Sequence, residues 1–411
     1  MAPALSFDFR GLVPRFLRYA RIDTQSNPEA SGYPSTLGQL AFGKLLLGEL
    51  QALGVKATQD SHGYVMGWLP GVGALAQAER MGFVAHMDTS PDAPGQAVKP
   101  RVVRFNGCPI ALGAPGMRLD PKTFPELMAY RGEEIVVSDG STLLGADDKA
   151  GIAAIMEAVA YWVGHPELPR RPVAVAFTLD EELGRGVEHF DLEAFGASLA
   201  YTVDGGEEPI LEHENFNAAE ARVTITGRSI HPGAAKDHMV NALELGMRFH
   251  ALLPPKARPE YTEGYEGFYH LDRLEGSVAQ AQLHYIVREH QAARFEQMKQ
   301  SLVDAAVRLN GQLGYQALQV ELEDQYYNMA LWLSAKSLPV KLGLRAITAS
   351  GLPAQTRPIR GGTDGALLTA KGLPCPNLFT GGRNYHSVYE YLPVRPFQKA
   401  CEVVTRLPLL D

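Results

Sequence analysis

The stretch Ala174-Val-Ala-Phe-Thr-Leu-Asp-Glu-Glu-Leu-Gly-Arg-Gly186 decides the fold, because an apolar run ends in acidic residues and glycines. Large apolar side chains alternate with small ones over Pro172–Leu179, which predicts a strand buried within a sheet. Glu181 and Glu182 follow at its carboxyl end, where open α/β sheets place their functional sites. Two adjacent carboxylates there are costly unless a cation compensates them, so the stretch favours a metal site. The alternative is a solvated turn with surface acids.

The two acids can also divide their work. Adjacent residues in extended backbone point in opposite directions, so one carboxylate can bind an ion while its neighbour faces another space. The free carboxylate is then available to accept and deliver a proton. We therefore expect a metal ligand and a general base side by side at Glu181 and Glu182.

Composition limits the class of protein. The chain has 411 residues, 45% of them hydrophobic and 20% charged, which predicts a soluble globular enzyme with two domains. The net charge of -8 without any basic run excludes a nucleic-acid partner and suits small cationic ligands. Three cysteines without CxxC spacing indicate neither disulfides nor a thiolate zinc site, and favour the reducing cytoplasm. The stretch Met1–Arg21 lacks the pattern of a signal peptide, and we expect no membrane span.

Helical and extended patterns alternate along the chain, which predicts an α/β fold. Over residues 216–325 the order becomes strand, helix, strand, helix, and we interpret this segment as an inserted, smaller α+β domain for dimerisation or for a lid. The catalytic domain is then discontinuous and comprises residues 1–215 and 326–411, with a mixed sheet flanked by helices. The Pro- and Gly-rich region Ala93–Gly116 is predicted to be a long loop.

Four further positions place metal-binding side chains next to strand or helix ends. His86 and Asp88 follow the apolar run Met81–Ala85, Asp147 precedes a helix, Asp204 ends a strand, and His386 follows a glycine pair. Each also has an ordinary alternative. His86 could be a turn histidine with Asp88 as its capping acid, and Asp147 could be a helix N-cap. Asp204 could be a turn residue, and His386 a structural histidine. Together with Glu182, however, they supply nitrogen and oxygen without sulfur. That donor set suits zinc, cobalt or manganese.

These residues, in this order and context, resemble the co-catalytic di-zinc exopeptidases and deacylases, and more closely the peptidase T family of tripeptide aminopeptidases. The resemblance spans nearly the whole chain. Its motifs include Pro34-Ser-Thr-Leu-Gly-Gln39, His62-Gly-Tyr-Val65, His86-Met-Asp-Thr-Ser-Pro-Asp92, Leu144-Gly-Ala-Asp-Asp-Lys-Ala-Gly151, Phe177-Thr-Leu-Asp-Glu-Glu182, Tyr201-Thr-Val-Asp-Gly-Gly206, Tyr265-Glu-Gly-Phe-Tyr269, Ile359-Arg-Gly-Gly-Thr-Asp-Gly365 and Leu373-Pro-Cys-Pro-Asn-Leu-Phe-Thr-Gly-Gly382.

The resemblance implies a role for each candidate. Asp147 bridges two zinc ions, His86 and Asp204 complete one site, and Glu182 and His386 complete the other. Glu181 is implied to be the general base, and Asp88 the catalytic residue that supports His86.

Two further positions follow from the resemblance. His231 is implied to reach the active site of a neighbouring subunit in a homodimer and to stabilise the oxyanion, and Arg360 to bind the substrate carboxylate. The sequence departs from the family pattern at Ser387, where a glycine usually follows the metal-binding histidine, and at Arg288-Glu-His-Gln291.

The expected function is hydrolysis of the N-terminal peptide bond of tripeptides by a water molecule activated by two zinc ions, in a cytoplasmic homodimer. A dipeptidase or N-acyl amino acid deacylase of the same superfamily would keep the same ligands and differ in how it recognises the amino end. A non-catalytic metal-binding protein is the remaining alternative, and the presence of Glu181 beside a full ligand set argues against it.

Overall fold

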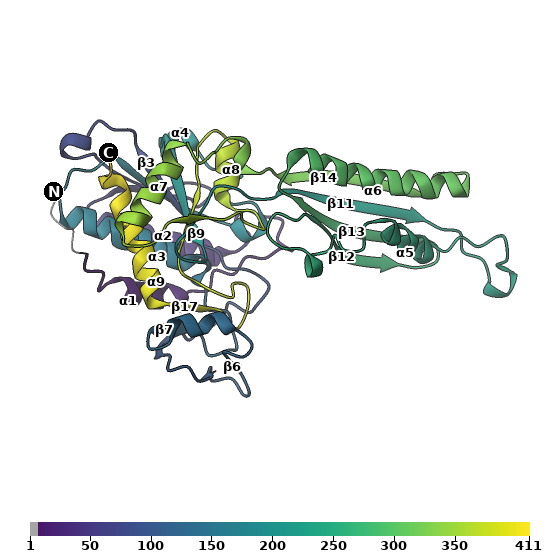
Figure 1. Cartoon of the computed structure of the whole chain (residues 1–411), viewed down its shortest axis with the longest axis horizontal. Helices are drawn as coiled ribbons and strands as arrows, with labels where there is room; N and C mark the ends of the chain where they lie inside the picture. The colour runs from purple at the N-terminus through teal and green to yellow at the C-terminus, as the bar shows by residue number, and fades with distance from the viewer. Residues whose placement is uncertain (1–6) are drawn as a thin grey trace. The chain divides into compact units, whose positions relative to one another are not determined.

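The computed structural model describes residues 7–411, so residues 1–6 of the stretch Met1–Arg21 lie outside the described part. The chain divides into two compact units (Figure 1). The larger unit runs to His213 and includes Trp332–Arg357 and Thr363–Asp411, and the smaller unit comprises Glu214–Leu331 and Pro358–Gly362. The predicted α/β fold with an inserted α+β unit is confirmed.

The larger unit is built on an eight-stranded mixed sheet. In spatial order its strands are β1 (Lys56–Gln59), β2 (Val65–Leu69), β8 (Val173–Thr178), β3 (Met81–His86), β9 (Leu199–Gly205), β16 (Asn377–Phe379), β10 (Ile210–Glu212) and β15 (Gln355–Thr356). The central strands β8, β3 and β9 are parallel, and every residue of β3 and β8 is buried. Both faces of these strands are therefore covered, which explains their nearly continuous apolar sequence.

Helices and short sheets complete the larger unit. The helices are α1 (Leu12–Ala20), α2 (Leu37–Ala52), α3 (Ala146–Gly164), α4 (Leu192–Phe195), α7 (Leu338–Ala349), α8 (Asp364–Ala370) and α9 (Val394–Arg406). A three-stranded sheet joins β17 (Tyr391–Pro393), β7 (Glu134–Val137) and β4 (Arg101–Arg104), and a two-stranded sheet joins β5 (Ile110–Ala111) and β6 (Arg118–Leu119). The prediction of a loop over Ala93–Gly116 is therefore wrong at β4 and β5. Both strands are short, and charged residues at the ends of β4 obscure its pattern.

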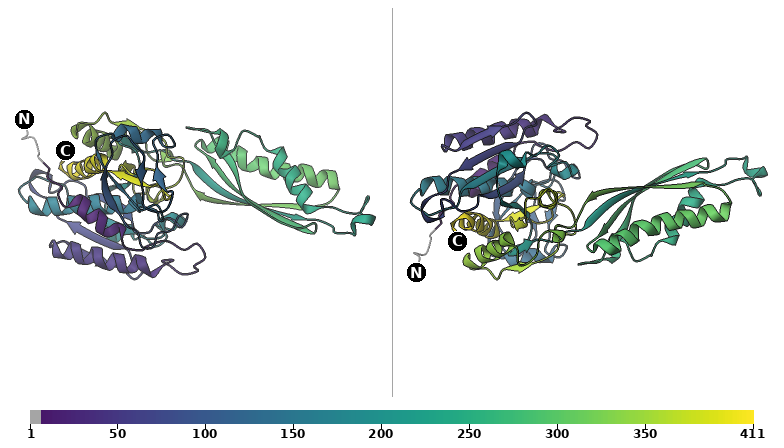
Figure 2. Two further views of the ribbon diagram at one scale, coloured as in Figure 1. Left: turned by 90° about the horizontal axis from the view of Figure 1, so that it is seen from below. Right: turned by 90° about the horizontal axis from the view of Figure 1, so that it is seen from above.

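The smaller unit is an antiparallel sheet with two helices. Its strands lie in the order β12 (Phe268–Gly276), β13 (Gln280–Glu289), β11 (Asn217–Thr226) and β14 (Leu318–Tyr326), and its helices are α5 (Ala242–Leu252) and α6 (Ala292–Leu313). Alternate residues of β11 and β13 pack with both helices into one core, and Figure 2 shows α6 running along the sheet. The predicted strand-helix-strand-helix order therefore lacks β12 and β14. These are the edge strands, whose many exposed polar residues hide the apolar alternation.

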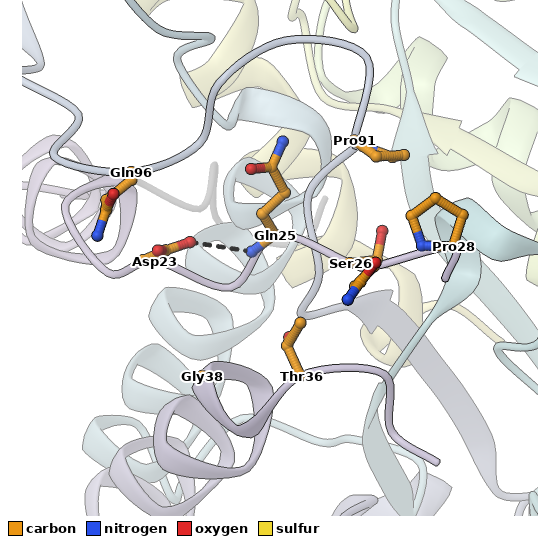
Figure 3. A pocket seen from close by; sticks show the side chains of 9 residues that line it. Asp23, Gln25, Ser26, Pro28, Thr36, Gly38, Pro91 and Gln96 are labelled. Carbon is orange, nitrogen blue, oxygen red and sulfur yellow. Dashed lines mark hydrogen bonds between the residues drawn. The ribbon is translucent and has the colours of Figure 1, made fainter. Parts of the chain in front are cut away.

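A cavity of about 580 Å³ lies beside the segment between α1 and α2 (Figure 3). Its lining is mixed polar and apolar and includes Asp23, Gln25, Thr36 and Gln96. The Asp23 carboxylate accepts a hydrogen bond from the backbone N–H of Gln25 at 3.2 Å. The cavity lining contains none of the predicted metal ligands among the described residues.

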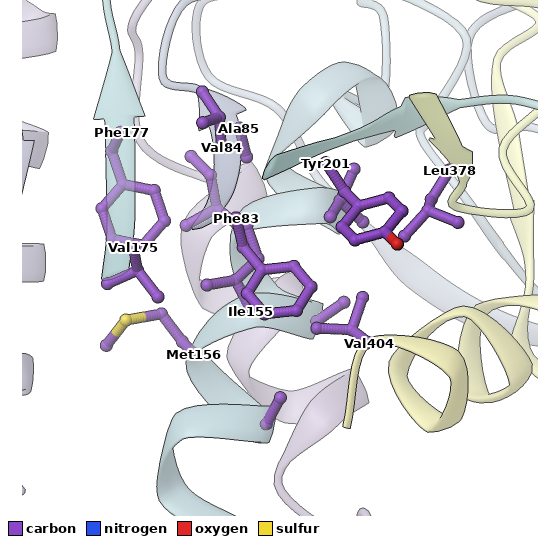
Figure 4. Packing of buried hydrophobic residues seen from close by; sticks show 14 of the residues in the cluster. Phe83, Val84, Ala85, Ile155, Met156, Val175, Phe177, Tyr201, Leu378 and Val404 are labelled. Carbon is purple, nitrogen blue, oxygen red and sulfur yellow. The ribbon is translucent and has the colours of Figure 1, made fainter. Parts of the chain in front are cut away.

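The core of the larger unit supports the carboxyl ends of its central strands. Phe83 of β3 packs near Ile155 of α3 and Tyr201 of β9, and Val175 of β8 lies near Met156 of α3 (Figure 4). Each such buried side chain contributes about 1.5–3 kcal/mol relative to its exposed state. The hydrophobic core therefore holds in place the strand ends that carry the acidic and histidine residues. Within the described residues, no helix is both long enough and apolar enough to cross a membrane.

Candidate metal centre

The five predicted ligands meet at one edge of the large sheet. His86 is the last residue of β3, Asp204 lies near the end of β9, and Glu182 follows β8 in a short 3-10 turn. His86 pairs with Thr178 across the parallel strands, which brings the turn after β8 level with the segment after β3. Asp147 lies at the start of α3 and His386 lies in the segment before β17.

Asp147 lies between the two histidines. Its Oδ1 is 2.8 Å from Nε2 of His86, and its Oδ2 is 3.2 Å from Nε2 of His386. Each carboxylate oxygen therefore faces a different imidazole. This is the arrangement by which one carboxylate can serve two cations that lie about 3.5–4 Å apart.

The remaining ligands divide between the two histidines. Asp204 Oδ1 is 3.5 Å from Nε2 of His86, whereas Glu182 Oε2 is 2.9 Å from Nε2 of His386. Ligand atoms of His86, Asp147 and Glu182 all lie within 4.8 Å of one another. Asp147 thus lies next to two groups, His86–Asp204 and Glu182–His386, that could each hold a cation.

The residues fit a pair of divalent cations. Glu182 Oε1 is buried and has no hydrogen-bond partner among the described residues, although an unpaired buried carboxylate oxygen is costly. Imidazole nitrogens and carboxylate oxygens are donors that zinc, cobalt and manganese accept. Cations at the two positions would satisfy this oxygen.

The pKa values of the acids in the cluster also favour bound cations. Burial, together with the charge of Asp147, raises the pKa of Glu182 to about 8 and that of Asp204 to about 6. Burial also opposes ionisation of Asp147, but hydrogen bonds to His386 and His86 lower the pKa of this carboxyl overall. The acids therefore cannot all ionise at neutral pH without added positive charge.

Asp148 also lies near His86 and Asp204. Its buried carboxylate, however, accepts the backbone N–H of His86 at 3.2 Å and that of Gly151 at 3.2 Å. These bonds fix the start of α3 against the end of β3. These bonds give Asp148 a structural role and leave Asp147 as the candidate for the shared position.

Asp88 contacts His86 at Nδ1, the ring nitrogen that faces away from the cluster. Its Oδ1 lies 3.4 Å from Nδ1 of His86, and its backbone carbonyl oxygen lies 3.1 Å from the same nitrogen. An N–H on Nδ1 leaves Nε2 of His86 unprotonated and directed at the cluster. The carboxylate also accepts the backbone N–H groups of Glu181 and Glu182, each at 3.1 Å.

The Glu181–Glu182 pair is not extended, so the geometric reason given for its divided directions is wrong. Glu181–Leu183 form a 3-10 turn, and Asp180 before it has left-handed backbone with φ 54°. The turn still separates the two carboxylates. Glu181 Oε2 is 4.0 Å from Nε2 of His86, whereas Glu182 contacts His386.

The backbone at His386 is also unusual. His386 has φ 59°, a conformation that non-glycine residues adopt at a cost and usually where surrounding contacts hold them. Its Nδ1 lies 3.2 Å from Oδ2 of Asp92, so Nε2 faces the cluster. The motif His86–Asp92 contains this second supporting acid, which sequence reasoning missed although the motif ends in it.

Sequence reasoning also missed the residues that fix the turn before Glu181. The Asp180 carboxylate accepts hydrogen bonds from Ser35 and from Nε2 of Gln39 at 2.7 Å, and Asp180 N–H donates to Oε1 of Gln39 at 3.0 Å. Ser35 and Gln39 belong to the Pro34–Gln39 motif, to which the sequence alone assigned no role. The reciprocal Gln39–Asp180 pair now gives the motif a structural purpose.

His231 and Arg360 belong to the smaller unit, whereas the metal ligands belong to the larger one. His231 is exposed, and its Nδ1 accepts the backbone N–H of Gly233 at 3.1 Å. Arg360 donates to the carbonyl oxygens of Gly264 at 2.8 Å and Glu266 at 3.0 Å. Its guanidinium also lies over the ring of Phe216, 5.1 Å from the centroid.

The chain is similar to known proteins in both sequence and fold. Residues 213–312 match the model of the peptidase dimerisation domain. Peptidase T of Clostridium acetobutylicum is 45% identical over 96% of this chain and 98% of its own length, and peptidase T of Shouchella clausii is 46% identical over 96% and 97%. The crystal structure of the aminopeptidase PepT from Bacillus cereus superposes with a TM-score of 0.78 at 22% identity, covering 98% of each chain.

The fold, the dimerisation domain and the clustered histidine and carboxylate groups define a metallopeptidase. The 45% sequence identity over nearly the whole chain also identifies the family, which similarity of fold alone would not do. The chain belongs to the peptidase T family, as its motifs predict, and is a peptide-bond hydrolase.

Proposed function

We propose that this peptidase is an aminopeptidase that removes the N-terminal residue from tripeptides. The observation that carries the proposal is the position of Asp147, whose two oxygens face His86 and His386 at 2.8 and 3.2 Å. Near full-length similarity to relatives named peptidase T supports the choice of substrate class.

Five residues would hold the metal ions, for which we propose two zinc ions per chain, with cobalt or manganese as substitutes. Asp147 would contact both, His86 and Asp204 would complete one position, and Glu182 and His386 the other. When bound, two divalent cations polarise the scissile carbonyl and lower the pKa of water.

Glu181 would act as the general base. It lies beside the cluster, 4.0 Å from Nε2 of His86, and Asp88 holds its backbone N–H at 3.1 Å. Its carboxylate would take a proton from the attacking water and deliver it to the leaving amine. Asp88 would contribute by holding both His86 and the turn that carries Glu181.

The smaller unit would supply dimerisation and substrate contacts. We propose that residues 216–325 form a domain inserted between the catalytic segments 1–215 and 326–411. This domain would join two chains in a homodimer and could act as a lid. The proposed location of the enzyme is the reducing cytoplasm. His231 is exposed, which is compatible with contact to a neighbouring subunit's active site, where it would stabilise the oxyanion. Arg360 would bind the substrate carboxylate, for which it must exchange some of its bonds to Gly264 and Glu266.

A panel of peptides tests the proposal. N-acetylated amino acids, and di-, tri- and tetrapeptides with free and acetylated N-termini, are compared by kcat/KM, and free tripeptides are expected to be the best substrates. Glu181→Gln is expected to retain two metal ions per chain and to lose turnover. Preferred cleavage of N-acetylated amino acids or of dipeptides would contradict the proposal and favour a deacylase or dipeptidase.

A further inference from the structure

Glu390 is a buried acid that no part of the proposed mechanism uses. Its side chain is 2% exposed, and its carboxylate accepts three backbone N–H groups. Oε2 accepts from Leu144 and Gly145, both at 2.7 Å, and Oε1 accepts from Asp147 at 3.1 Å. These three hydrogen bonds partly offset the cost of burying this carboxylate.

The turn at Leu144 and Gly145, which contacts Glu390, has a backbone shape suited to binding an anion. Gly145 has left-handed backbone with φ 76°, so the amides of Leu144 and Gly145 point to one side. Successive N–H groups in such a turn form a concave anion-binding nest. The carboxylate of Glu390 fills this nest, and Asp147 follows two residues after Gly145.

Glu390 also belongs to the segment that carries His386. It lies four residues beyond His386 and directly before β17, which pairs with β7. The segments of Asp147 and His386 therefore meet twice, once through the Glu390 carboxylate and once where Asp147 Oδ2 lies 3.2 Å from His386 Nε2. The first contact fixes the backbone, and the second is the pair of proposed ligands.

We propose that Glu390 is a positioning residue that sets the spacing between Asp147 and His386 and so prepares the metal position formed by Asp147, Glu182 and His386. The inference rests on the proposed dinuclear site. It explains why an acid lies beside an already acidic cluster without being a ligand. Its three acceptor contacts go to backbone N–H groups, which leaves the side chain of Asp147 free for the cations.

The test is metal binding by the full-length chain in the absence of substrate. Metal-free wild type, Glu390→Gln and Glu390→Ala are titrated with cobalt(II), and the visible absorption and the bound metal per chain are recorded. Gln keeps the volume but replaces one acceptor oxygen with an NH₂ group that faces N–H donors. We expect one cobalt position to weaken by about 10- to 100-fold in Glu390→Gln, and more in Glu390→Ala, while the other position is kept.

Glu157→Gln is the matched control. Glu157 is 8% exposed and accepts the backbone N–H of Gly11 at 3.1 Å, so this variant also disrupts a buried carboxylate–amide contact. It is expected to bind two cobalt ions as wild type does. High cobalt should restore kcat in Glu390→Gln with KM for tripeptides unchanged, which a general loss of folding would not produce.

The outcomes separate the two proposals. Wild type that binds fewer than two ions would contradict the dinuclear site itself. Wild type and Glu390→Gln that both bind two ions with equal affinity would overturn only the role of Glu390, whatever the stability of the variant.

Discussion

The carboxylate of Asp88 lies 3.1 Å from the backbone nitrogen of Glu181 and at the same distance from that of Glu182. The same carboxylate lies 3.4 Å from Nδ1 of His86. One acid therefore sets the orientation of a proposed ligand and the position of the turn that carries both the proposed base and a second ligand.

Asp88→Asn is expected to reduce both metal affinity and turnover. The amide keeps the size of the side chain but places an NH₂ group against N–H donors or against His86. Loss of such a supporting partner costs about 10- to 100-fold in metal affinity or activity. Metal titration and kcat/KM measure the effect. Asp60→Asn is the control, since Asp60 also accepts backbone N–H groups, in a turn at His62 and Gly63, and unchanged values are expected.

Gln39→Leu is expected to destabilise the protein and to slow catalysis with little change in metal content. The substitution removes both hydrogen bonds to Asp180 and leaves buried polar groups without partners, at a cost of about 1–3 kcal/mol. Denaturant unfolding and kcat give the two readouts. Gln59→Leu serves as control, because the Gln59 amide donates longer hydrogen bonds, at 3.4 and 3.2 Å, to the carbonyl oxygens of Leu40 and Gly63. Equal kcat in both variants would argue against a role of Gln39 in holding the turn.

Gly151→Ala is expected to unfold at a markedly lower temperature. A Cβ at this position would collide with the carbonyl oxygen of Val203 and with the Asp148 carboxylate, so α3 would have to move away from β9. Forcing extra volume into such a contact costs about 1–3 kcal/mol or more. Gly164→Ala in the same helix meets no atom within 4 Å and should change stability little. Thermal unfolding of the two variants decides the matter.

Removal of metal ions is expected to lower the melting temperature. Ions that bind only the folded state stabilise it by about 2.7 kcal/mol at a free concentration of 100 times Kd. Without them the acids at Asp147, Glu182 and Asp204 repel one another. Scans with chelator and with graded zinc should show a concentration-dependent rise. Asp147→Asn should lose most of that rise, and a full rise in this variant would contradict the shared position of Asp147.

Lys149 predicts a pH dependence of stability. Its side chain is 1% exposed, and burial lowers its pKa from 10.5 to about 8. Between these pH values the unfolded chain holds a proton that the folded protein has released, so stability rises as pH rises from about 8 to 10.5. The corresponding free energy is about 3 kcal/mol.

Lys149→Met removes this dependence in metal-free protein. Its stability advantage over wild type, measured by urea unfolding, should be greatest below pH 8 and should shrink towards pH 10.5. Lys44→Met, at an exposed position of α2, should follow wild type at every pH. Parallel curves for Lys149→Met and wild type would show that Lys149 is charged equally in both states.

The central strands could be predicted from sequence because they depend on local pattern, and so could the gathering of candidate ligands at the strand ends. Burial on both faces makes β3 and β8 apolar throughout, and acids or histidines placed directly after such strands are conspicuous. The edge strands β12 and β14 show no continuous apolar pattern, because most of their residues are exposed to solvent and need not be apolar. The 3-10 turn at Glu181 was likewise hidden, since it depends on contacts with Asp88.

Supporting residues were the hardest to predict. Glu390 reaches amides 243 to 246 positions earlier in the chain, and nothing in its own neighbourhood distinguishes it from a surface acid. Asp92 and Gln39 lie in motifs that were noticed, yet their partners His386 and Asp180 are distant in sequence. Long-range hydrogen bonds of this kind leave no periodic trace.

The order of the ligands along the chain has a consequence for folding. His86 and His386 stand on opposite sides of the inserted unit in sequence, and both approach Asp147. Cations bound there would cross-link the first and last parts of the larger unit, as a disulfide does, and would restrict the unfolded chain only where metal stays bound. Metal uptake would then report that the polypeptide on either side of the insertion has joined, which makes it a natural probe of the last stage of assembly.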